Sequence, residues 1–443
     1  MVEILFIIIV LGITIFVHEL GHFATAKLMG ISVEKFSIGW GPKIVAFKKG
    51  GTEYQISWLL FLGGYVKMEG ENPQEIQDAG DKGFLNQPVY KRIIVAVSGV
   101  AMNMVLAVVL IWVVLTAGTD TLKTQVGKVK QGYPAAEAGI IKGDLITEIN
   151  GDKVMYWEQL TGAIKENGGE PLEIKALRDG KKITATVYPV VEDTENIIND
   201  IITRPVIGIE PLAYLNVVES LDEKYPAFEA GLEPGDEITA VNNVKTDYWD
   251  EVAEQIKKAE GGIKLDVKRD GEEKVFNIKP KMEERKTADG EKETAPVLGI
   301  MPKGNFIKET YSPVKAAEKS VEKTVFFTAI TVKAVYKMIS GKMEPDVAGP
   351  VGVMHITYQV AKTGFVNLLM LFAIININLA LVNILPILPL DGGLVLLFAV
   401  EGIIKRPVPL KIQEALMQAG WYLLIILIVF FTYKDILRLF GGD

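Results

Sequence analysis

Residues 18–22 of the chain are His-Glu-Leu-Gly-His, and they lie inside an apolar stretch that covers residues 2–27. On a helix, positions i and i+4 share a face, so His18 and His22 can bind one Zn²⁺ ion while Glu19 reaches a water molecule on it. Such polar groups are costly inside a membrane span and need a function or a polar partner. The stretch therefore predicts a catalytic zinc site within a membrane helix, and the alternative is a structural polar cluster.

The composition indicates a membrane protein that also carries hydrated domains. Of 443 residues, 49% are hydrophobic and 23% are charged, a mixture typical of membrane spans alternating with water-exposed parts. The net charge of −8 argues against a nucleic-acid partner, because nucleic-acid binders present a basic face. The absence of cysteine excludes thiolate zinc sites, disulfides and cysteine nucleophiles.

Four apolar stretches have the length of about 20 residues that a bilayer-spanning helix needs. They cover residues 2–27, Ile93–Ala117, Phe365–Leu390 and Ala415–Thr432. Lysine and arginine are concentrated between the first and second spans and between the third and fourth. The positive-inside rule therefore places both of these loops in the cytoplasm, with both termini and residues 118–364 on the external side.

The external segment contains an internal repeat. Tyr133–Gly139 recurs as Tyr225–Gly231, and Gly143-Asp144 recurs as Gly235-Asp236, at a constant offset of 92 residues. Alternating runs predict strands, and Arg-Asp-Gly at 178–180 and at 269–271 predicts hairpin turns. Both copies carry A-x-x-A-G-(I/L)-x-x-G-D-x-I-x-x-(I/V)-N and resemble the PDZ domains of bacterial proteases. PDZ domains can bind C-terminal peptides or act as passive size filters, and the pattern leaves both roles open.

A helix is predicted after the repeats, because Ser312-Pro313 is typical of a helix start. Apolar residues then recur at spacings of 3, 4 or 7 as far as Ile339, which indicates an amphipathic helix. It could lie on the membrane surface or pack on the second PDZ domain. Residues 341–352 are predicted to form a turn-rich loop.

Catalytic zinc needs a third protein ligand and an open fourth position. His355 is the only remaining histidine, and it precedes the third span on the external side. In the predicted topology the first and third spans both run inward, so His18, His22 and Asp391 lie at matching depth. We therefore predict Asp391 as the third ligand; the alternative is that Asp391 belongs to a helix-ending Asp-Gly-Gly turn.

With these motifs the chain resembles the site-2 protease family of intramembrane zinc metalloproteases, in its bacterial branch with tandem PDZ domains, the regulator of sigma-E protease type. The family pattern N-x-x-P-x-P-x-L-D-G is matched at Asn383, Pro386 and residues 390–392, but its second proline is displaced to Pro389. Residues 99–100 are Gly-Val where relatives often have Gly-Pro, ahead of the asparagine matched by Asn103.

The resemblance implies further site residues. Asn378 and Asn383 correspond to asparagines that engage an unwound substrate. Gly63, Gly64 and Tyr65, within Gly63–Met68, correspond to a membrane-associated β-hairpin whose edge strand receives substrate; an ordinary cytoplasmic hairpin is the alternative. Residues 349–352 resemble the family's post-PDZ loop.

We expect an α-helical membrane core of four spans with an inserted pair of β-rich PDZ domains. The expected activity is hydrolysis of peptide bonds within transmembrane segments, with one Zn²⁺ per chain and Glu19 as catalytic base. The resemblance implies the bacterial inner membrane, periplasmic PDZ domains, and substrates already cut by another protease. A non-enzymatic PDZ scaffold and a transporter are the competing interpretations. The predicted segments are residues 1–117 (membrane core), 118–206 (first PDZ), 207–302 (second PDZ), 303–364 (amphipathic helix and loop) and 365–443 (membrane core).

Overall fold

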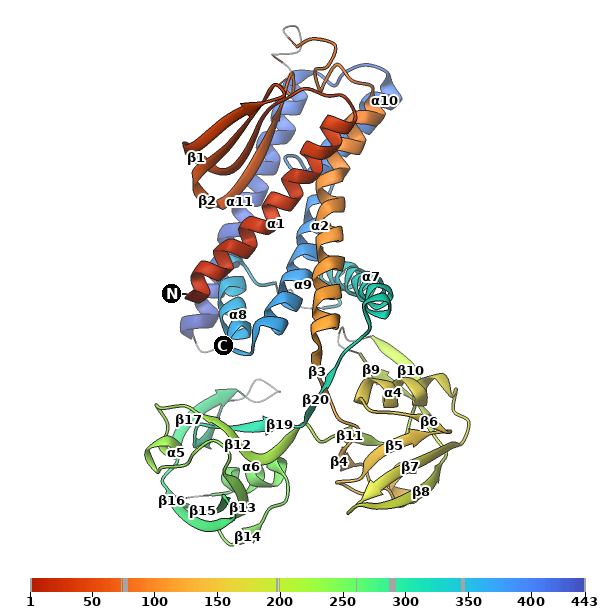
Figure 1. Ribbon diagram of the computed structural model, residues 1–443, viewed down its shortest axis with the longest axis vertical. Coiled ribbons are helices and arrows are strands. Elements are labelled where there is room, and N and C mark those ends of the chain that lie inside the picture. Colours follow the sequence, from red (N-terminus) through yellow and green to blue (C-terminus); the bar gives the residue numbers. More distant parts are fainter. Residues whose placement is uncertain are drawn as a thin grey trace. The chain divides into compact units, whose positions relative to one another are not determined.

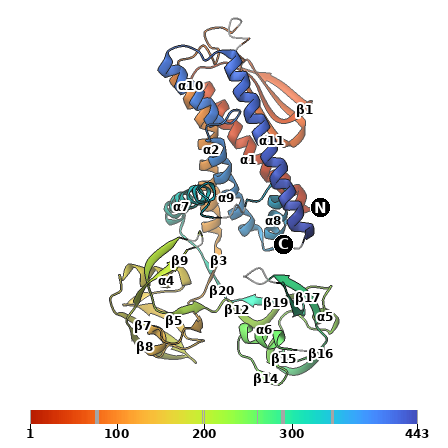
Figure 2. The same cartoon turned by 180° about the vertical axis from the view of Figure 1, so that it is seen from behind.

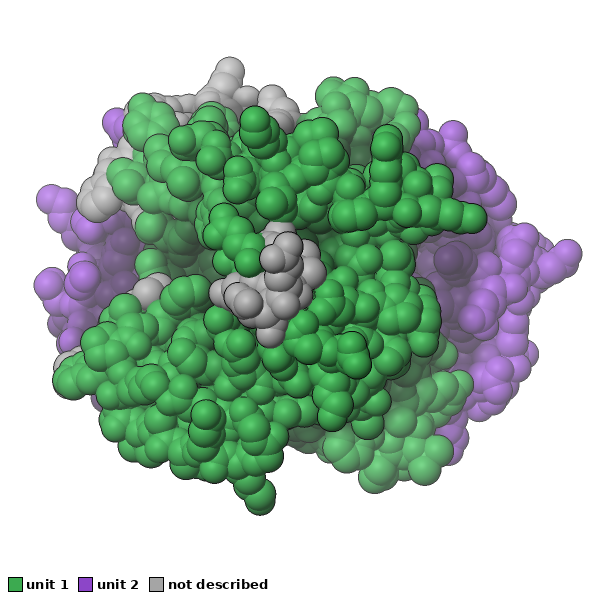
Figure 3. Space-filling view, turned by 90° about the horizontal axis from the view of Figure 1, so that it is seen from above, with its two compact units in different colours: residues 1–119, 310–443 green, residues 120–309 purple. Residues whose placement is uncertain are grey.

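The computed structural model describes residues 2–72, 74, 79–196, 198, 200–259, 261–286, 292–343 and 347–441, with the backbone alone at residues 2–11, 60–62, 285–286, 292 and 439–441. The chain divides into two compact units, which Figure 3 colours separately. Residues 1–119 and 310–443 form the first unit, and residues 120–309 form the second. Two segments far apart in the sequence thus build one unit, and the other is inserted between them.

The first unit is a helical bundle arranged around α2, which packs against α1, α7, α9 and α10 (Figures 1 and 2). Its core includes Ala107 and Ile111 of α2 and Ala373 and Ile377 of α9, all fully buried. The helices of this unit are α1 (Val2–Leu28), α2 (Val89–Ala117), α7 (Pro313–Ile339), α8 (Pro350–Lys362), α9 (Phe365–Asn383), α10 (Asp391–Ile404) and α11 (Leu410–Gly441).

Three helices in the described part of the chain are long and apolar enough to cross a membrane. They are α2, α9 and α11, the last over Leu410–Arg438. The first predicted span coincides with α1, a helix of 27 residues whose first ten side chains lie outside the described residues. Length and hydropathy thus support a membrane protein, and the prediction of a span at α1 remains a prediction.

The prediction for the third span is wrong at its end. Helix α9 ends at Asn383 rather than Leu390, and a short irregular segment follows it. Pro386 and Pro389 explain this break, since proline lacks the N–H that continues a helix. Asp391 does not close the span: it is the first residue of the new helix α10, so the helix-ending turn is excluded.

The hairpin predicted at Gly63–Met68 is part of β1 (Val33–Lys49) and β2 (Thr52–Met68), which lie beside α1 in Figure 1. Both strands bend, so residues 33–38 pair with 64–68 on one side and with 53–56 on the other. Residues 64–68 have no other strand partner within the described residues. They therefore form an edge of this small sheet.

The region after the repeats is helical for longer than expected. Within the first unit, α7 packs on α2 and α9 through small residues such as Ala316 and Ser320. The apolar residues whose spacing predicted this helix, among them Val325, are exposed. The predicted loop 341–352 ends early because Pro350 begins α8, and Asp435 of α11 accepts hydrogen bonds from the N–H groups of Gly349 (3.0 Å) and Gly352 (2.7 Å).

The second unit contains the two repeats, each with a buried core of its own. The predicted turns are confirmed: Asp179 and Asp270 have φ of 49° and 51°, and a glycine with positive φ follows each. In each repeat the arginine before the turn holds a fully buried aspartate, Arg178 with Asp144 at 2.8 Å and Arg269 with Asp236 at 2.6 Å. The repeated Gly-Asp thus anchors the hairpin to the start of its sheet.

The first repeat extends beyond the predicted boundary at residue 206. Ile207 is part of its core, and β11 pairs with β4. The second repeat likewise continues past residue 302 to the end of β19, which pairs with β12. The elements of the first repeat are β4 (Val126–Val129), α3 (Pro134–Glu137), β5 (Leu145–Ile149), β6 (Asp152–Lys153), α4 (Trp157–Glu166), β7 (Leu172–Arg178), β8 (Lys181–Val187), β9 (Val190–Glu195), β10 (Ile201–Val206) and β11 (Ile209–Pro211).

The second repeat has the same order of elements. Its main sheet has the order β16-β15-β13-β12-β19, and that of the first repeat is β6-β5-β7-β8. The strands β3 (Thr119–Leu122) and β20 (Phe306–Glu309) pair with each other. The elements of the second repeat are β12 (Tyr214–Leu221), α5 (Pro226–Glu229), β13 (Glu237–Val241), β14 (Val244–Lys245), α6 (Trp249–Lys257), β15 (Ile263–Arg269), β16 (Glu272–Ile278), β17 (Lys281–Lys286), β18 (Lys292–Val297) and β19 (Ile300–Gly304).

Candidate metal centre

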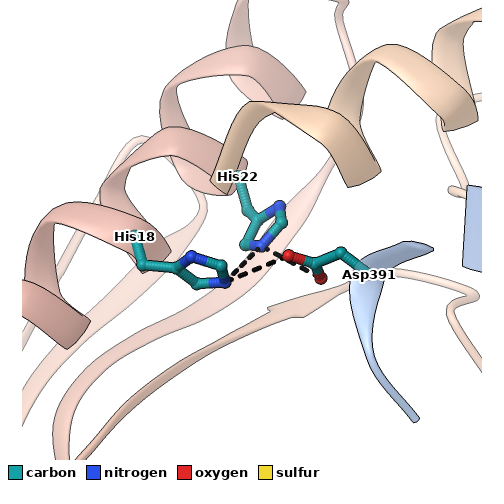
Figure 4. Close-up of side chains that lie close together, drawn as sticks. All are labelled: His18, His22 and Asp391. Carbon is teal, nitrogen blue, oxygen red and sulfur yellow. Dashed lines mark hydrogen bonds and ion pairs between the residues drawn. The ribbon is translucent and has the colours of Figure 1, made fainter. Parts of the chain in front are cut away.

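His18 and His22 project from one face of α1 toward Asp391, the first residue of α10 (Figure 4). The two Nε2 atoms lie 3.2 Å apart. Asp391 Oδ2 lies 3.2 Å from Nε2 of His18, and Oδ1 lies 3.5 Å from Nε2 of His22. Residues separated by about 370 positions in the sequence therefore present three ligand atoms to one point.

The separations fit a metal ion better than a set of hydrogen bonds. Ligand atoms about 2.0–2.1 Å from a tetrahedral zinc ion lie about 3.3 Å from one another. The three observed separations bracket this value. In addition, Asp391 Oδ2 is buried and receives no hydrogen bond from the described residues. A cation between the three side chains would satisfy this oxygen, so the donor set fits zinc.

The other ring nitrogens of the two histidines are held by α2. His22 Nδ1 lies 2.8 Å from the carbonyl oxygen of Val95, which can only accept, so Nδ1 carries the proton. His18 Nδ1 lies 3.2 Å from the side-chain amide of Asn103, a fully buried residue. The amide nitrogen of Asn103 faces Nδ1, and its oxygen is buried without a partner among the described residues; exchanging the two by a 180° turn of the amide lets the oxygen accept the proton of Nδ1. Both Nε2 lone pairs then face Asp391, as metal ligation requires.

Gly99 of α2 leaves the room that the imidazoles occupy. A Cβ at this position would lie 2.6 Å from Cε1 of His22 and 2.8 Å from Cε1 of His18. Gly21 plays a similar part between the helices, because its Cβ would lie 2.8 Å from Met102 Cγ. Only glycine at both positions lets α1 approach α2 this closely.

Glu19 lies beside the three ligands without being one of them. Its carboxylate lies near the backbone N–H of Val66, in the edge segment of β2. A Cβ on Gly64 would lie 3.6 Å from Glu19 Cγ, and one on Gly63 would lie 3.0 Å from Ile15 Cδ1. The sheet edge therefore runs directly past Glu19.

The remaining predicted residues lie in different positions. Tyr65 is half-buried, and its hydroxyl accepts a hydrogen bond from Gln55 at 3.2 Å. Asn383 is the last residue of α9, eight positions before Asp391. Asn378 is exposed on α9 and accepts a hydrogen bond from Thr331 of α7 at 3.3 Å, so the structure does not bring it to the ligand atoms.

Comparison with known proteins identifies the family. Residues 6–427 match the profile of peptidase family M50. The chain belongs to this family. Among its relatives, the regulator of sigma-E protease RseP of Escherichia coli (strain K12) is 29% identical over 450 residues, and protease RseP of Yersinia pestis is 28% identical over 453; each alignment covers 98% of both chains.

A solved PDZ domain of an SdrC-like protein from Listeria monocytogenes is also similar, at 25% identity over 21% of this chain and 90% of that chain, with a TM-score of 0.17. Membership of family M50 makes the chain a zinc metalloprotease. The scaffold and transporter interpretations are therefore wrong. His355, the histidine set aside from the sequence, lies on α8 with its Nε2 2.6 Å from Gln359 Nε2.

Some residues of this M50 centre carry roles that the sequence did not indicate. In the sequence, Gly99 belongs to the Gly-Val departure from the family pattern and Asn103 matches the asparagine of that pattern. Neither observation predicts a contact with an imidazole. Asn376 of α9 is fully buried, and its amide lies 3.2 Å from Thr14 of α1, one turn before His18. The signal that could have found it is the occurrence of a further asparagine, besides Asn378 and Asn383, in the middle of an apolar span.

Proposed function

We propose that the chain is an intramembrane peptidase that cuts within membrane-spanning segments, with one zinc ion per chain held by His18, His22 and Asp391. The observation that carries this proposal is the convergence of the Asp391 carboxylate with the two Nε2 atoms, at separations of 3.2, 3.2 and 3.5 Å. These residues come from two apolar helices, α1 and α10, so the centre lies among hydrophobic segments. A peptide bond cut there would belong to a chain that is itself in the membrane.

Glu19 would act as the general base. Zinc, when bound, supplies the Lewis acidity that makes a water molecule acidic near neutral pH and polarises a carbonyl group. Glu19 stands next to the ligands without joining them, so its carboxylate can accept the proton of the attacking water and pass it to the leaving amine. The N–H of Val66 would hold this carboxylate in place.

The edge of β2 would bind the substrate. A transmembrane helix hides its backbone N–H and C=O groups and must unwind before it can be cut. Residues 64–68 offer an unpaired strand edge to such a segment, and β-strand addition would place it beside Glu19. The side-chain amides of Asn383, at the end of α9, and of Asn378 would form hydrogen bonds with the backbone groups of the substrate. These bonds would replace the hydrogen bonds within the substrate helix.

The two repeats would act as tandem PDZ domains on the periplasmic side of a bacterial inner membrane, with the active site toward the cytoplasm. They would exclude substrates with bulky external domains, so cutting would follow an earlier cleavage by another protease. C-terminal peptides are their alternative ligands. The relatives are named for the regulation of sigma-E. The family resemblance of the motifs suggests membrane-tethered anti-sigma factors as substrates, and clearance of signal-peptide remnants is a second candidate.

The proposal is tested on the full-length protein in detergent with a single-span substrate. Glu19→Gln is expected to keep about one zinc per chain and to lose cleavage, whereas His22→Phe and Asp391→Leu are expected to lose both. His355→Phe is the matched control, because this histidine lies outside the cluster, and it should retain both. Cleavage by Glu19→Gln, or full zinc content in Asp391→Leu, would contradict the assignment.

A further inference from the structure

A cavity of about 840 Å³ lies where α2 begins, α10 ends and α11 begins. It is lined by Pro88 and Val89 at the start of α2 and by residues 407–410 leading into α11. Around the end of α10 its lining residues are Glu401, Gly402, Lys405 and Arg406. Since α2 and α11 are both long and apolar enough to span a membrane, their ends lie at the level of the lipid headgroups. The cavity does not include the metal centre.

Two cations in this cavity have no acidic partner. Lys405 and Arg406 line it, both are exposed, and neither forms an ion pair within the described part of the chain. The only acid among the lining residues, Glu401, is already engaged on both oxygens. Arg92 donates to Oε2 at 2.7 Å, and the N–H of Val408 donates to Oε1 at 3.0 Å. The uncompensated charge of the cavity is therefore positive.

Arg92 supplies a buried donor without an acceptor. The residue is 8% exposed, lines the cavity and stacks on Phe398, with its guanidinium carbon 4.7 Å from the ring centroid. Its Nε is buried and has no hydrogen-bond partner among the described residues. A buried donor of this kind normally has a partner. Because this nitrogen does not open onto the cavity, Arg92 fixes Glu401 in the wall and is not itself a contact of a bound anion.

The start of α2 adds to the positive electrostatic potential of the cavity. This helix of 29 residues has no acidic residue in its first turn, and Pro88 at its N-cap offers no side-chain acceptor. The N–H groups of Lys91 and Arg92 donate to the Pro88 carbonyl, so those of Val89 and Tyr90, with the positive end of the helix dipole, remain available to an anion. Apolar side chains, including Val89, Pro407 and Leu410, complete the wall. A group that is anionic at one end and apolar next to it fits this lining.

We propose that this cavity binds the phosphate headgroup of an anionic phospholipid. The phosphate would contact Lys405, Arg406 and the start of α2, and the glycerol and first methylene groups would lie against the apolar wall. Basic pockets between membrane helices bind such headgroups in the same way. The site is independent of the zinc ligands proposed above.

The test compares lipid binding by the full-length protein and two variants in nanodiscs. Lys405→Asn/Arg406→Gln removes the two unpaired charges, and asparagine tolerates the positive φ of 57° at position 405. Lys48→Gln/Lys49→Gln removes two exposed charges near the tip of the β1–β2 hairpin and is the matched control. The readout is the affinity for labelled phosphatidylglycerol against a phosphatidylcholine background.

The wild type and the control should prefer phosphatidylglycerol, and the Lys405/Arg406 variant should bind it about 30-fold more weakly, which corresponds to about 2 kcal/mol. Equal affinities in the wild type and this variant would overturn the proposal. An equal loss in the Lys48/Lys49 control would do so too, since it would indicate attraction to the surface in general. Displacement of the lipid by millimolar inorganic phosphate would show a site for free phosphate and would likewise overturn it.

Discussion

Replacing Gly99 with alanine tests the geometry of the metal centre most directly. The added Cβ would lie 2.6 Å and 2.8 Å from the Cε1 atoms of His22 and His18, whereas carbon atoms normally approach to about 3.5 Å. These two contacts alone would require the rings to retreat by about 0.7–0.9 Å, and Nε2 of His22 lies closer still to the added Cβ, while a metal site tolerates about 0.2 Å. We expect zinc affinity to fall at least tenfold and kcat/KM to fall by about 100-fold, the effect of a displacement near 1 Å.

The assay measures zinc content by mass spectrometry and cleavage of a single-span substrate, with circular dichroism as the folding check. Alanine is favoured over glycine by about 1 kcal/mol in a helix, so helix propensity does not explain a loss. Gly162→Ala on α4 is the matched control, since a Cβ there meets nothing within 4 Å. A Gly99→Ala protein with wild-type zinc content and activity would refute the packing argument.

Asn103→Leu removes the acceptor for His18 Nδ1–H and should weaken zinc binding by about 10–100-fold in a chelator competition, whereas Asn103→Asp should retain it; equal affinities would contradict the role of the amide. Gly64→Val places a side chain against the Ser37 carbonyl and near Glu19, so cleavage should fall while zinc content stays at the wild-type level. Burial alone would raise the pKa of Asp236, but the hydrogen bonds from Arg269 hold it below its usual value. The second repeat should therefore keep its full stability above about pH 4 and lose it as the pH falls through the lower folded pKa, a dependence that hydrogen exchange would show and that Asp236→Asn should abolish.

The local features of the chain followed from short-range patterns. The i, i+4 spacing of His18 and His22 needs only a helix to place both on one face. The Arg-Asp-Gly turns were predictable for the same reason, since two residues with positive φ define a tight hairpin whatever surrounds it. The long apolar runs set the membrane helices because the bilayer fixes their length.

The break between α9 and α10 could be predicted only in part from the sequence. Pro386 and Pro389 indicate an interruption, yet the apolar character of residues 384–390 favoured a continuous span. Hydropathy reports the environment of a segment and not its backbone geometry, so it could not place Asp391 at the start of a helix. The repeat boundaries were missed similarly, because β11 belongs to the first repeat through its pairing with β4, 80 residues earlier.

The sequence by itself determined the chemistry of this protein: two imidazoles and a carboxylate base on an apolar helix, and a second carboxylate at matching depth. Only the tertiary structure decided how these groups are held. Gly99 matters because another helix presses its imidazoles against that position, and Val66 matters because its N–H lies near Glu19. Such contacts join residues tens to hundreds of positions apart. They depend on the packing of whole helices and sheets, which no local pattern encodes.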